Sequence, residues 1–108
     1  SWFGEAADGL LIDLRIPRVA SDPAVVPAAS RPGGANTMGY YRLHGSPHMY
    51  YSQYSVDFLS QLKEQFLRTD LPQLPTWCVF DNTASGAATA DALKLRELVS
   101  GVATGGNA

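Results

Sequence analysis

The chain has 108 residues, of which 45% are hydrophobic and 17% charged, and its formal net charge is −2. This composition is typical of one globular domain with one core, and it argues against binding to polyanions through bulk electrostatics. The single cysteine, Cys78, excludes a disulfide framework within the chain and favours a cytoplasmic setting. No apolar run reaches the roughly 20 residues that a membrane span needs.

The first part of the chain predicts a helix, a strand and a long loop. Phe3, Ala7, Leu10 and Leu14 recur at helical spacing over residues 3–14, with Leu11 beside them, and Glu5 in the first turn suits the positive end of the helix dipole. Residues 15–22 predict a short strand, in which Pro17 is tolerated only at the first residue or at an edge. Residues 23–38 contain three prolines and two glycines, which predicts an irregular loop of a length that is often functional.

The middle of the chain predicts a strand followed by an amphipathic helix. Residues 38–45 are rich in aromatic side chains and end at Gly45, as a strand does. Residues 55–68 predict a helix with Ser55 as its N-cap. The apolar stripe of this helix consists of Leu59, Leu62 and Phe66.

The last part predicts a strand, a helix and a tail. Residues 76–82 form a continuous apolar run, typical of a strand buried on both faces of a parallel sheet. A helix follows over about residues 85–100, and residues 101–108 are expected to form a flexible tail. The apolar side of this helix is predicted to consist of Ala88, Ala92, Leu95 and Val99.

The alternation of strands and helices predicts an α/β fold with a parallel sheet and right-handed crossovers. A sheet of three strands leaves the first and third strands at its edges. Because natural proteins rarely leave apolar edges uncovered, we expect another element to complete the sheet.

Polar side chains lie at the carboxyl end of each predicted strand: Asp22, His44 and the pair Asp81-Asn82. In parallel α/β folds this edge binds ligands, because the loops that leave the strands converge there. Alternation within the second strand also places Arg42 on the same face as His44.

The same alternation places Arg18 and Asp22 on one face of the first strand. We therefore expect two arginines and a histidine to point towards one interior, with Asp22 and Asp81 as counter-charges. The alternative is that these groups form structural ion pairs at the rim of the core.

Three segments carry a resemblance to a known family: "RVASDPA" (18–24), "YYRLHGSPHMYYSQYS" (40–55) and "WCVFDNTASGAATADAL" (77–93). In this order they resemble the C-terminal part of the domain of unknown function 72 family, the YecE-like proteins. The resemblance implies a TIM-barrel-like fold, which typically needs about 250 residues. Residues 1–100 would then be a partial barrel of about three βα units, carrying approximately its sixth, seventh and eighth strands. The expected partner is the missing N-terminal portion of the barrel or a second copy of the chain.

The resemblance also points to particular residues. Arg42, His44 and Gly45 match an Arg-x-His-Gly element of the family, and Tyr51 and Tyr54 match the tyrosines that follow. Many family members have Asn-Asn where this chain has Asp81-Asn82, so an acid replaces an amide at the first position. This departure leaves open whether Asp81 binds the same ligand or only pairs with an arginine.

The residues at the start of the last helix suggest an anion site. Thr83 and Ser85 supply hydroxyl groups, and a helix N-terminus with small residues lets an anion approach the backbone N–H groups. The alternative is that Asn82 or Thr83 only caps the helix. The two interpretations are compatible.

His44 is the best acid–base candidate, since its ordinary pKa lies near neutrality, although a histidine beside an arginine is often structural. A metal site formed by His44 and His48 is disfavoured, because Gly45 and the proline that follows it exclude a helix there. If a metal binds, ligands such as Asp22, His44 or Asp81 are better placed. The tyrosines at 50, 51 and 54 either stack on a ligand or pack over the barrel mouth.

Two hypotheses for the function follow. The first is a barrel enzyme that acts on a phosphorylated or otherwise anionic substrate, with Arg42 as an anion clamp and His44 as acid or base. Asp22 or Asp81 would orient these two side chains. The second is a non-catalytic module that binds the phosphate of a nucleotide or nucleic acid. The sequence indicates no particular cofactor, and this chain alone is expected to be inactive because a barrel site draws on several strand ends.

Overall fold

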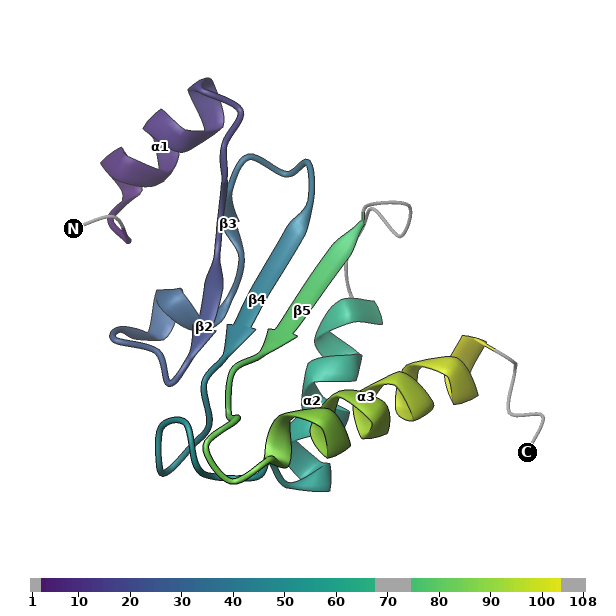
Figure 1. Ribbon diagram of the computed structural model, residues 1–108. Coiled ribbons are helices and arrows are strands. Elements are labelled where there is room, and N and C mark those ends of the chain that lie inside the picture. The colour runs from purple at the N-terminus through teal and green to yellow at the C-terminus, as the bar shows by residue number, and fades with distance from the viewer. Residues whose placement is uncertain (1–2, 68–74, 104–108) are drawn as a thin grey trace.

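The structure is a computed structural model that describes residues 3–67 and 75–103, with the side chains of residues 102 and 103 excepted. Its elements follow the chain as shown in Figure 1. They are α1 (Glu5–Asp13), β1 (Pro17–Arg18), β2 (Ala20–Asp22), the 3-10 helix η1 (Pro27–Ser30), β3 (Gly33–Gly34), β4 (Gly39–Leu43), α2 (Val56–Leu67), β5 (Thr76–Phe80) and α3 (Ala87–Ala103).

The central feature is a three-stranded parallel sheet in the order β2-β4-β5. In register, Ala20 lies beside Tyr41 and Tyr41 lies beside Cys78. The predicted parallel sheet is therefore confirmed, and so is the expectation that the first and third strands are its outer strands.

The region before β4 is more regular than predicted. The expected strand over residues 15–22 is divided into β1 and β2, and β1 pairs antiparallel with β3, which lies inside the expected loop. Gly34 makes this pairing possible: its φ is +66°, and a Cβ at this position would collide with the carbonyl oxygen of Ile16. Its N–H donates to Asp8 Oδ1 at 2.6 Å, which ties β3 to α1.

Helix α1 packs against β1 and β3 and lies apart from the other helices (Figure 1). Only Leu11 is buried in it. Leu10 and Leu14, which were expected on its inward stripe, are 49% and 58% exposed. The predicted helix is confirmed, but its predicted buried face is not.

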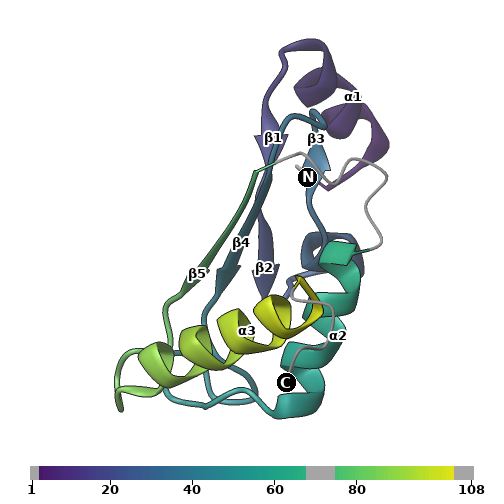
Figure 2. The ribbon, with the colours of Figure 1, turned by 90° about the vertical axis from the view of Figure 1, so that its right-hand side faces the viewer.

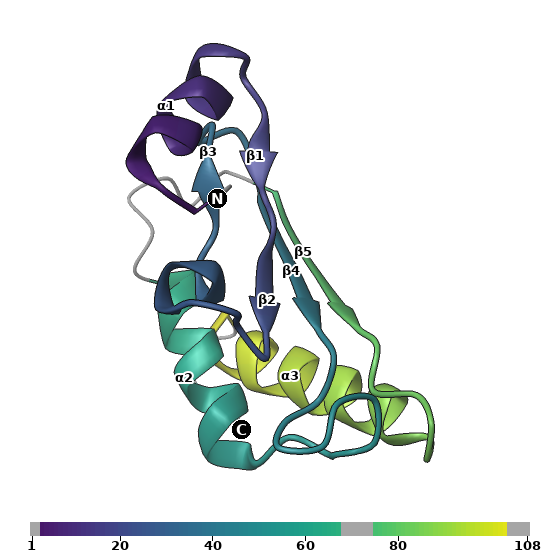
Figure 3. The same cartoon turned by 90° about the vertical axis from the view of Figure 1, so that its left-hand side faces the viewer.

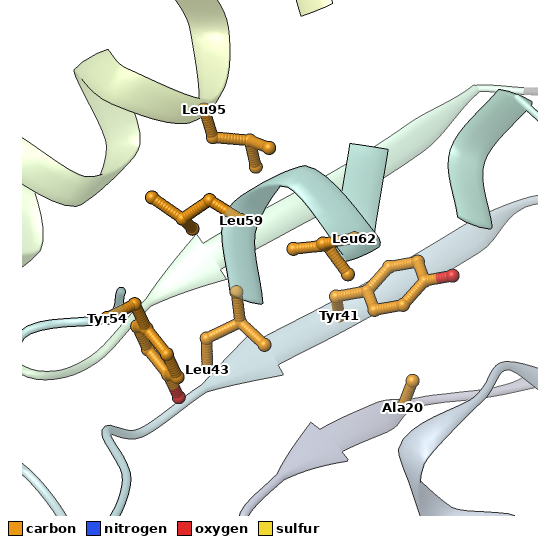
Figure 4. Packing of buried hydrophobic residues seen from close by; sticks show 7 residues of the cluster. All are labelled: Ala20, Tyr41, Leu43, Tyr54, Leu59, Leu62 and Leu95. Carbon is orange, nitrogen blue, oxygen red and sulfur yellow. The ribbon is translucent and has the colours of Figure 1, made fainter. Parts of the chain in front are cut away.

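Helices α2 and α3 pack against each other on one side of the three-stranded sheet, as Figures 2 and 3 show. Ser55 caps α2, since its Oγ accepts the N–H of Phe58 at 3.1 Å. Figure 4 shows the core that these layers enclose. Its buried members are Ala20, Tyr41, Leu43, Tyr54, Leu59, Leu62 and Leu95.

The sheet therefore has two different faces. The covered face carries Tyr41 and Leu43 of β4 and, in register with them, Cys78 and Phe80 of β5. The open face carries the alternate residues Tyr40, Arg42, Trp77 and Val79, and none of the helices in the described ranges covers it. Trp77 is 60% exposed, so the prediction that residues 76–82 are buried on both faces is wrong for this chain.

Helix α3 also departs from its predicted boundaries and stripe. It begins at Ala87 and continues to Ala103, so residues 101–103 belong to the helix and not to a tail. Residues 104–108 of the expected tail lie outside the described residues. Ala92 is exposed, whereas Asp91 is buried with Ala88 and Leu95.

Candidate functional site

Three of the predicted site residues meet at the carboxyl ends of β4 and β5 on the open face. Arg42 belongs to β4, and His44 and Asp81 directly follow β4 and β5. The backbone ladder continues past both strands, because His44 N–H donates to Asp22 O and Asp81 N–H donates to Leu43 O, each at 2.7 Å. This register brings Asp81 beside His44 and close to Arg42.

One carboxylate oxygen, Asp81 Oδ2, contacts both basic side chains. It accepts hydrogen bonds from Arg42 Nε at 3.0 Å and from Nη2 at 2.7 Å. His44 Nδ1 lies 3.2 Å from the same oxygen, but the contact lacks hydrogen-bond geometry. The hydrogen bonds from Arg42 and the negative charge of Asp81 raise the pKa of Arg42 further above its usual value. We call Arg42, His44 and Asp81 the polar trio.

The polar trio suits acid–base chemistry next to an anion. The carboxylate lies on the Nδ1 side of the imidazole, which leaves Nε2 as the ring nitrogen available to a substrate proton. Arg42 is exposed, so its guanidinium can reach a ligand, although Asp81 offsets part of its charge. The side chain of Arg42 is 47% exposed and those of His44 and Asp81 are each 23% exposed, so solvent reaches all three.

Asp22 and Arg18 do not join the polar trio, which corrects the prediction of one shared interior. Asp22 pairs in register with Leu43 and therefore lies on the covered side, where its Oδ2 accepts the hydroxyl of Tyr54 at 2.8 Å. Burial, together with this hydrogen bond, raises the pKa of Tyr54 above its usual range. Arg18 lies 3.5 Å from Asp8 and over the ring of Phe3.

Asn82 is fully buried and does not cap α3. Its Nδ2 donates to Asp91 Oδ2 at 2.7 Å and to Ser52 O at 2.9 Å, while its Oδ1 has no hydrogen-bond partner. Asp91 Oδ2 also accepts the N–H of Tyr54 at 3.0 Å. Asn82 and Asp91 therefore tie the end of β5 to α3 and to the loop after β4.

Asp91 and Ser52 are the residues that the sequence analysis missed. For Asp91 a signal was present. It lies three residues after Ala88 and four before Leu95, so a carboxylate occupies a position of the buried stripe of α3. A charged group on such a stripe is rarely buried unless it is hydrogen-bonded, and here it accepts two hydrogen bonds.

Gly45 is required by the path of the loop that leaves β4. Its φ is +100°, and a Cβ would lie within 3.2 Å of His48 O, Asn82 Cβ and Ser52 O. Its N–H donates to the hydroxyl of Tyr54 at 2.8 Å. Gly45 is thus a structural residue that holds the end of β4 against the buried Asn82.

The tyrosines of this loop have different environments. Tyr54 is buried and stacks on Phe58 with ring centroids 4.5 Å apart, so it packs in the core. Tyr50 and Tyr51 are exposed, and the ring of Tyr50 lies edge-on to His44 at 5.7 Å. Tyr50 has a φ of +70°, a conformation that non-glycine residues rarely adopt and that tends to occur at functional sites.

The segment before α3 forms a turn. Gly86 N–H donates to Thr83 O at 3.0 Å, and Ala84 N–H donates to Tyr50 O at 3.0 Å. Thr83 and Ser85 are exposed, so their hydroxyl groups are accessible on the same edge of the sheet as the polar trio. This placement leaves the predicted anion site at this turn a prediction.

Residues 3–67 and 75–103 contain neither a metal-ligand cluster nor a helix that could cross a membrane. No group of three or more His, Cys, Asp or Glu side chains within these ranges has an arrangement that suits a metal ion. The helices in these ranges are too short or too polar to cross a membrane.

The fold and the strand-end site define an α/β protein built on a parallel sheet. The chain belongs to the family described as "Protein of unknown function DUF72", whose sequence model matches residues 1–106. The resemblance drawn from the three sequence segments is therefore confirmed. No curated protein matches the chain.

A solved structure of a DUF72 family protein from Thermotoga maritima is similar to the chain, with a TM-score of 0.74 and 22% sequence identity. The similarity covers 93% of this chain and 43% of that one, so the chain spans less than half the length of this relative. At this identity the similarity supports the α/β fold and carries no information about activity.

Proposed function

We propose that the polar trio is the anion-binding and acid–base centre of an enzyme that acts on a phosphorylated or otherwise anionic substrate. The observation that carries the proposal is the position of Asp81 Oδ2, which contacts Arg42 and His44 at once. In this arrangement Arg42 binds the anionic group, His44 transfers a proton, and Asp81 orients both.

The rest of such an enzyme is a TIM-barrel-like fold in which the open face of the sheet is the barrel interior. Trp77 and the partly buried Tyr40 and Val79 on this face support the proposal, as do the outer edges of β2 and β5, which pair with no strand among the described residues. The partner that covers them is the N-terminal portion of the barrel or, alternatively, a second copy of the chain. Because barrel sites combine residues from several strand ends, the 108-residue chain alone is inactive.

The anion-binding half of the proposal is testable with inorganic phosphate. An NMR titration of the chain should move the backbone signals of residues 42–44 and 81, with millimolar affinity. Arg42→Gln should weaken binding, whereas Asp81→Asn should strengthen it, because it removes a negative charge beside the phosphate. Arg96→Gln, which removes an equivalent exposed charge on α3, is the matched control and should change little. Equal affinities in the Arg42 and Arg96 variants would contradict the proposal.

The proposed role of His44 as an acid or base is tested by measuring turnover and phosphate affinity separately. In a longer chain that turns over a phosphorylated substrate, His44→Ala should abolish turnover and leave phosphate affinity unchanged. Equal loss of turnover and affinity would assign His44 to binding. Turnover by the 108-residue chain at the rate of the longer chain would contradict the requirement for a completed barrel.

A second candidate function is a non-catalytic module that binds the phosphate of a nucleotide or nucleic acid. The exposed ring of Tyr50 beside His44, with the exposed Tyr51 following it in the chain, favours this function, since aromatic side chains beside a basic group can stack a base. Binding that falls steeply with salt would support contacts to a polyanion, and a flat salt response would argue against them.

A further inference from the structure

A cavity of about 210 Å³ lies on the covered side of the sheet, away from the polar trio. It lies where η1 and the residue after it approach β2, β4 and α2. Residues that line it include Asp22, Arg31, Tyr41, Gln61, Leu62 and Gln65. All of these elements belong to this chain, so the cavity does not depend on what completes the open face.

The hydroxyl group of Tyr41 has no protein partner in this cavity. The residue is 5% exposed, and its ring packs edge-on against Phe66 with centroids 5.1 Å apart. No hydrogen bond joins its hydroxyl group to another residue in the described part of the chain. The buried polar atoms without a partner in the described residues are Arg18 Nε, His44 Nδ1 and Asn82 Oδ1, so the Tyr41 hydroxyl is not sealed in the core but reaches the cavity, where it is free to bond a ligand or water.

The Tyr41 hydroxyl is a hydrogen-bond donor at neutral pH. Burial raises the pKa of Tyr41 to about 12, even though the charge of nearby Arg31 acts in the opposite direction. The group is therefore protonated and offers its hydrogen to an acceptor on a ligand.

Arg31 supplies the positive charge at this end of the cavity. Its side chain forms no ion pair with a carboxylate among residues 3–67 and 75–103. An adjoining hollow of about 400 Å³ shares Arg31, Gln61 and Gln65 with the cavity, and Arg31 is exposed, so solvent reaches this end. The amide side chains of Gln61 and Gln65 offer further donors for an anionic group.

Away from Arg31, the wall of the cavity is first apolar and, further along, carries the carboxylate of Asp22. Leu62 and Phe58 of α2 face the cavity beside Leu43, which provides an apolar surface. Tyr41 lies beside Ala20 in the sheet, and Asp22 is two residues beyond Ala20 on β2, a distance of roughly 7 Å. A second negative charge on a ligand would meet Asp22, so the cavity favours a ligand with a single anionic group at the Arg31 end.

We propose that this cavity binds a small organic carboxylate, whose charged group pairs with Arg31 and accepts the Tyr41 hydroxyl, and whose apolar body lies against Leu62 and Phe58. The cavity is smaller than the roughly 300–1,000 Å³ of pockets for drug-sized molecules, so the ligand is the size of a small metabolite. This site is separate from the polar trio and goes beyond the proposed function.

Benzoate and its neutral analogue benzamide test the proposal on the 108-residue chain. In an NMR titration, benzoate should move the signals of residues 31, 41, 62 and 65 with a dissociation constant in the millimolar range. Benzamide should bind about threefold to fivefold more weakly, and Arg31→Gln should reduce benzoate affinity to the level of benzamide. Arg96→Gln, the matched control on the exposed side of α3, should leave benzoate affinity unchanged.

Tyr41→Phe provides a second variant, because it keeps the ring in the core and removes only the hydroxyl donor. It should weaken benzoate by about threefold without changing the chemical shifts of the distant residues in α1. The proposal is overturned if benzoate moves no signal around the cavity, if it moves only those of the open face around Trp77, or if neither Arg31→Gln nor Tyr41→Phe changes its affinity.

Discussion

The two faces of the same sheet have opposite roles, although both carry large side chains. On the covered face, Tyr41 and Leu43 lie beneath α2 and are at most 5% exposed. On the open face, Arg42 lies between Tyr41 and Leu43 in β4, and Trp77 precedes Cys78 in β5. Both Arg42 and Trp77 are exposed. The difference shows that alternation assigns a side chain to a face, whereas only the next layer decides whether that face is buried.

The comparison also separates stability from chemistry. The covered face holds the apolar core and the buried hydrogen bonds of Asp91, and the open face holds the polar trio. We expect substitutions beneath the helices to change the free energy of unfolding, and substitutions in the trio to change ligand binding.

The largest effect is expected for Leu59→Ala, in the centre of the covered face. Leu59 is 1% exposed, so its truncation should reduce the free energy of unfolding by about 2–5 kcal/mol, through lost burial and the cavity left behind. Urea unfolding followed by circular dichroism measures this change.

Trp77→Ala on the open face is the comparison for Leu59→Ala. Because the indole is 60% exposed, its loss should cost less than about 1 kcal/mol. A cost as large as that of Leu59→Ala would show that the open face is covered in solution. If the unfolding midpoint then rises with protein concentration, the cover is a second copy of the chain.

The next largest effect is expected for Asp91→Ala. This change removes the acceptor of the Tyr54 N–H and one of the two acceptors of Asn82 Nδ2, which keeps only Ser52 O, at a cost of about 2–4 kcal/mol in the free energy of unfolding. Asp91→Asn keeps an acceptor oxygen and should cost less. Glu97→Ala, an exposed acid on the same helix, is the control. If thermal unfolding shows that Glu97→Ala destabilises the chain as much as Asp91→Ala, the buried role of the Asp91 carboxylate is contradicted.

The alternation of the three sheet strands with the helices, and the meeting of the polar trio, could be predicted from the sequence because both follow from local rules. Strands and helices alternate, and in a parallel sheet the residues after adjacent strands meet at one edge. His44 and Asp81 follow β4 and β5, so this rule brings them together.

The misplacement of Asp22 has a different cause. Alternation fixes which residues share a face within one strand, but the register between strands decides whether two such sets share a face. Here Ser21, and not Asp22, lies beside Arg42, so Asp22 is on the covered side. Register depends on backbone pairing between segments that lie far apart in the chain, and no pattern within residues 15–22 contains it.

A smaller effect is expected from Cys78, whose thiol lies on the covered face. Burial raises the pKa of Cys78 from 9.0 to about 12, so the folded chain keeps this proton to a higher pH than the unfolded chain. The stability from this group is complete below about pH 9 and declines as the pH rises towards 12.

The comparison of wild type with Cys78→Ala isolates this contribution. Between pH 8 and pH 10 the wild-type chain should lose about 1 kcal/mol more of its free energy of unfolding than the variant. Parallel pH profiles would show that the thiol is solvated in the folded chain. In the same samples iodoacetamide should alkylate the folded chain at least about a hundredfold more slowly than the chain in urea, because the thiolate is the reactive form.

The smallest effect on stability is expected for Arg42→Gln. Arg42 is exposed and its contact with Asp81 is solvated, so its removal should leave the urea midpoint unchanged, as should Arg96→Gln on α3. This result matters for the function because an ion pair that contributes nothing to folding has no structural reason to hold Asp81 against His44. If Arg42→Gln and Asp81→Asn both lower the midpoint and the Arg96 variant does not, the ion pair is a structural contact at the rim of the core. In that case neither variant should change phosphate affinity, whereas weaker binding by Arg42→Gln and tighter binding by Asp81→Asn at an unchanged midpoint would support a site.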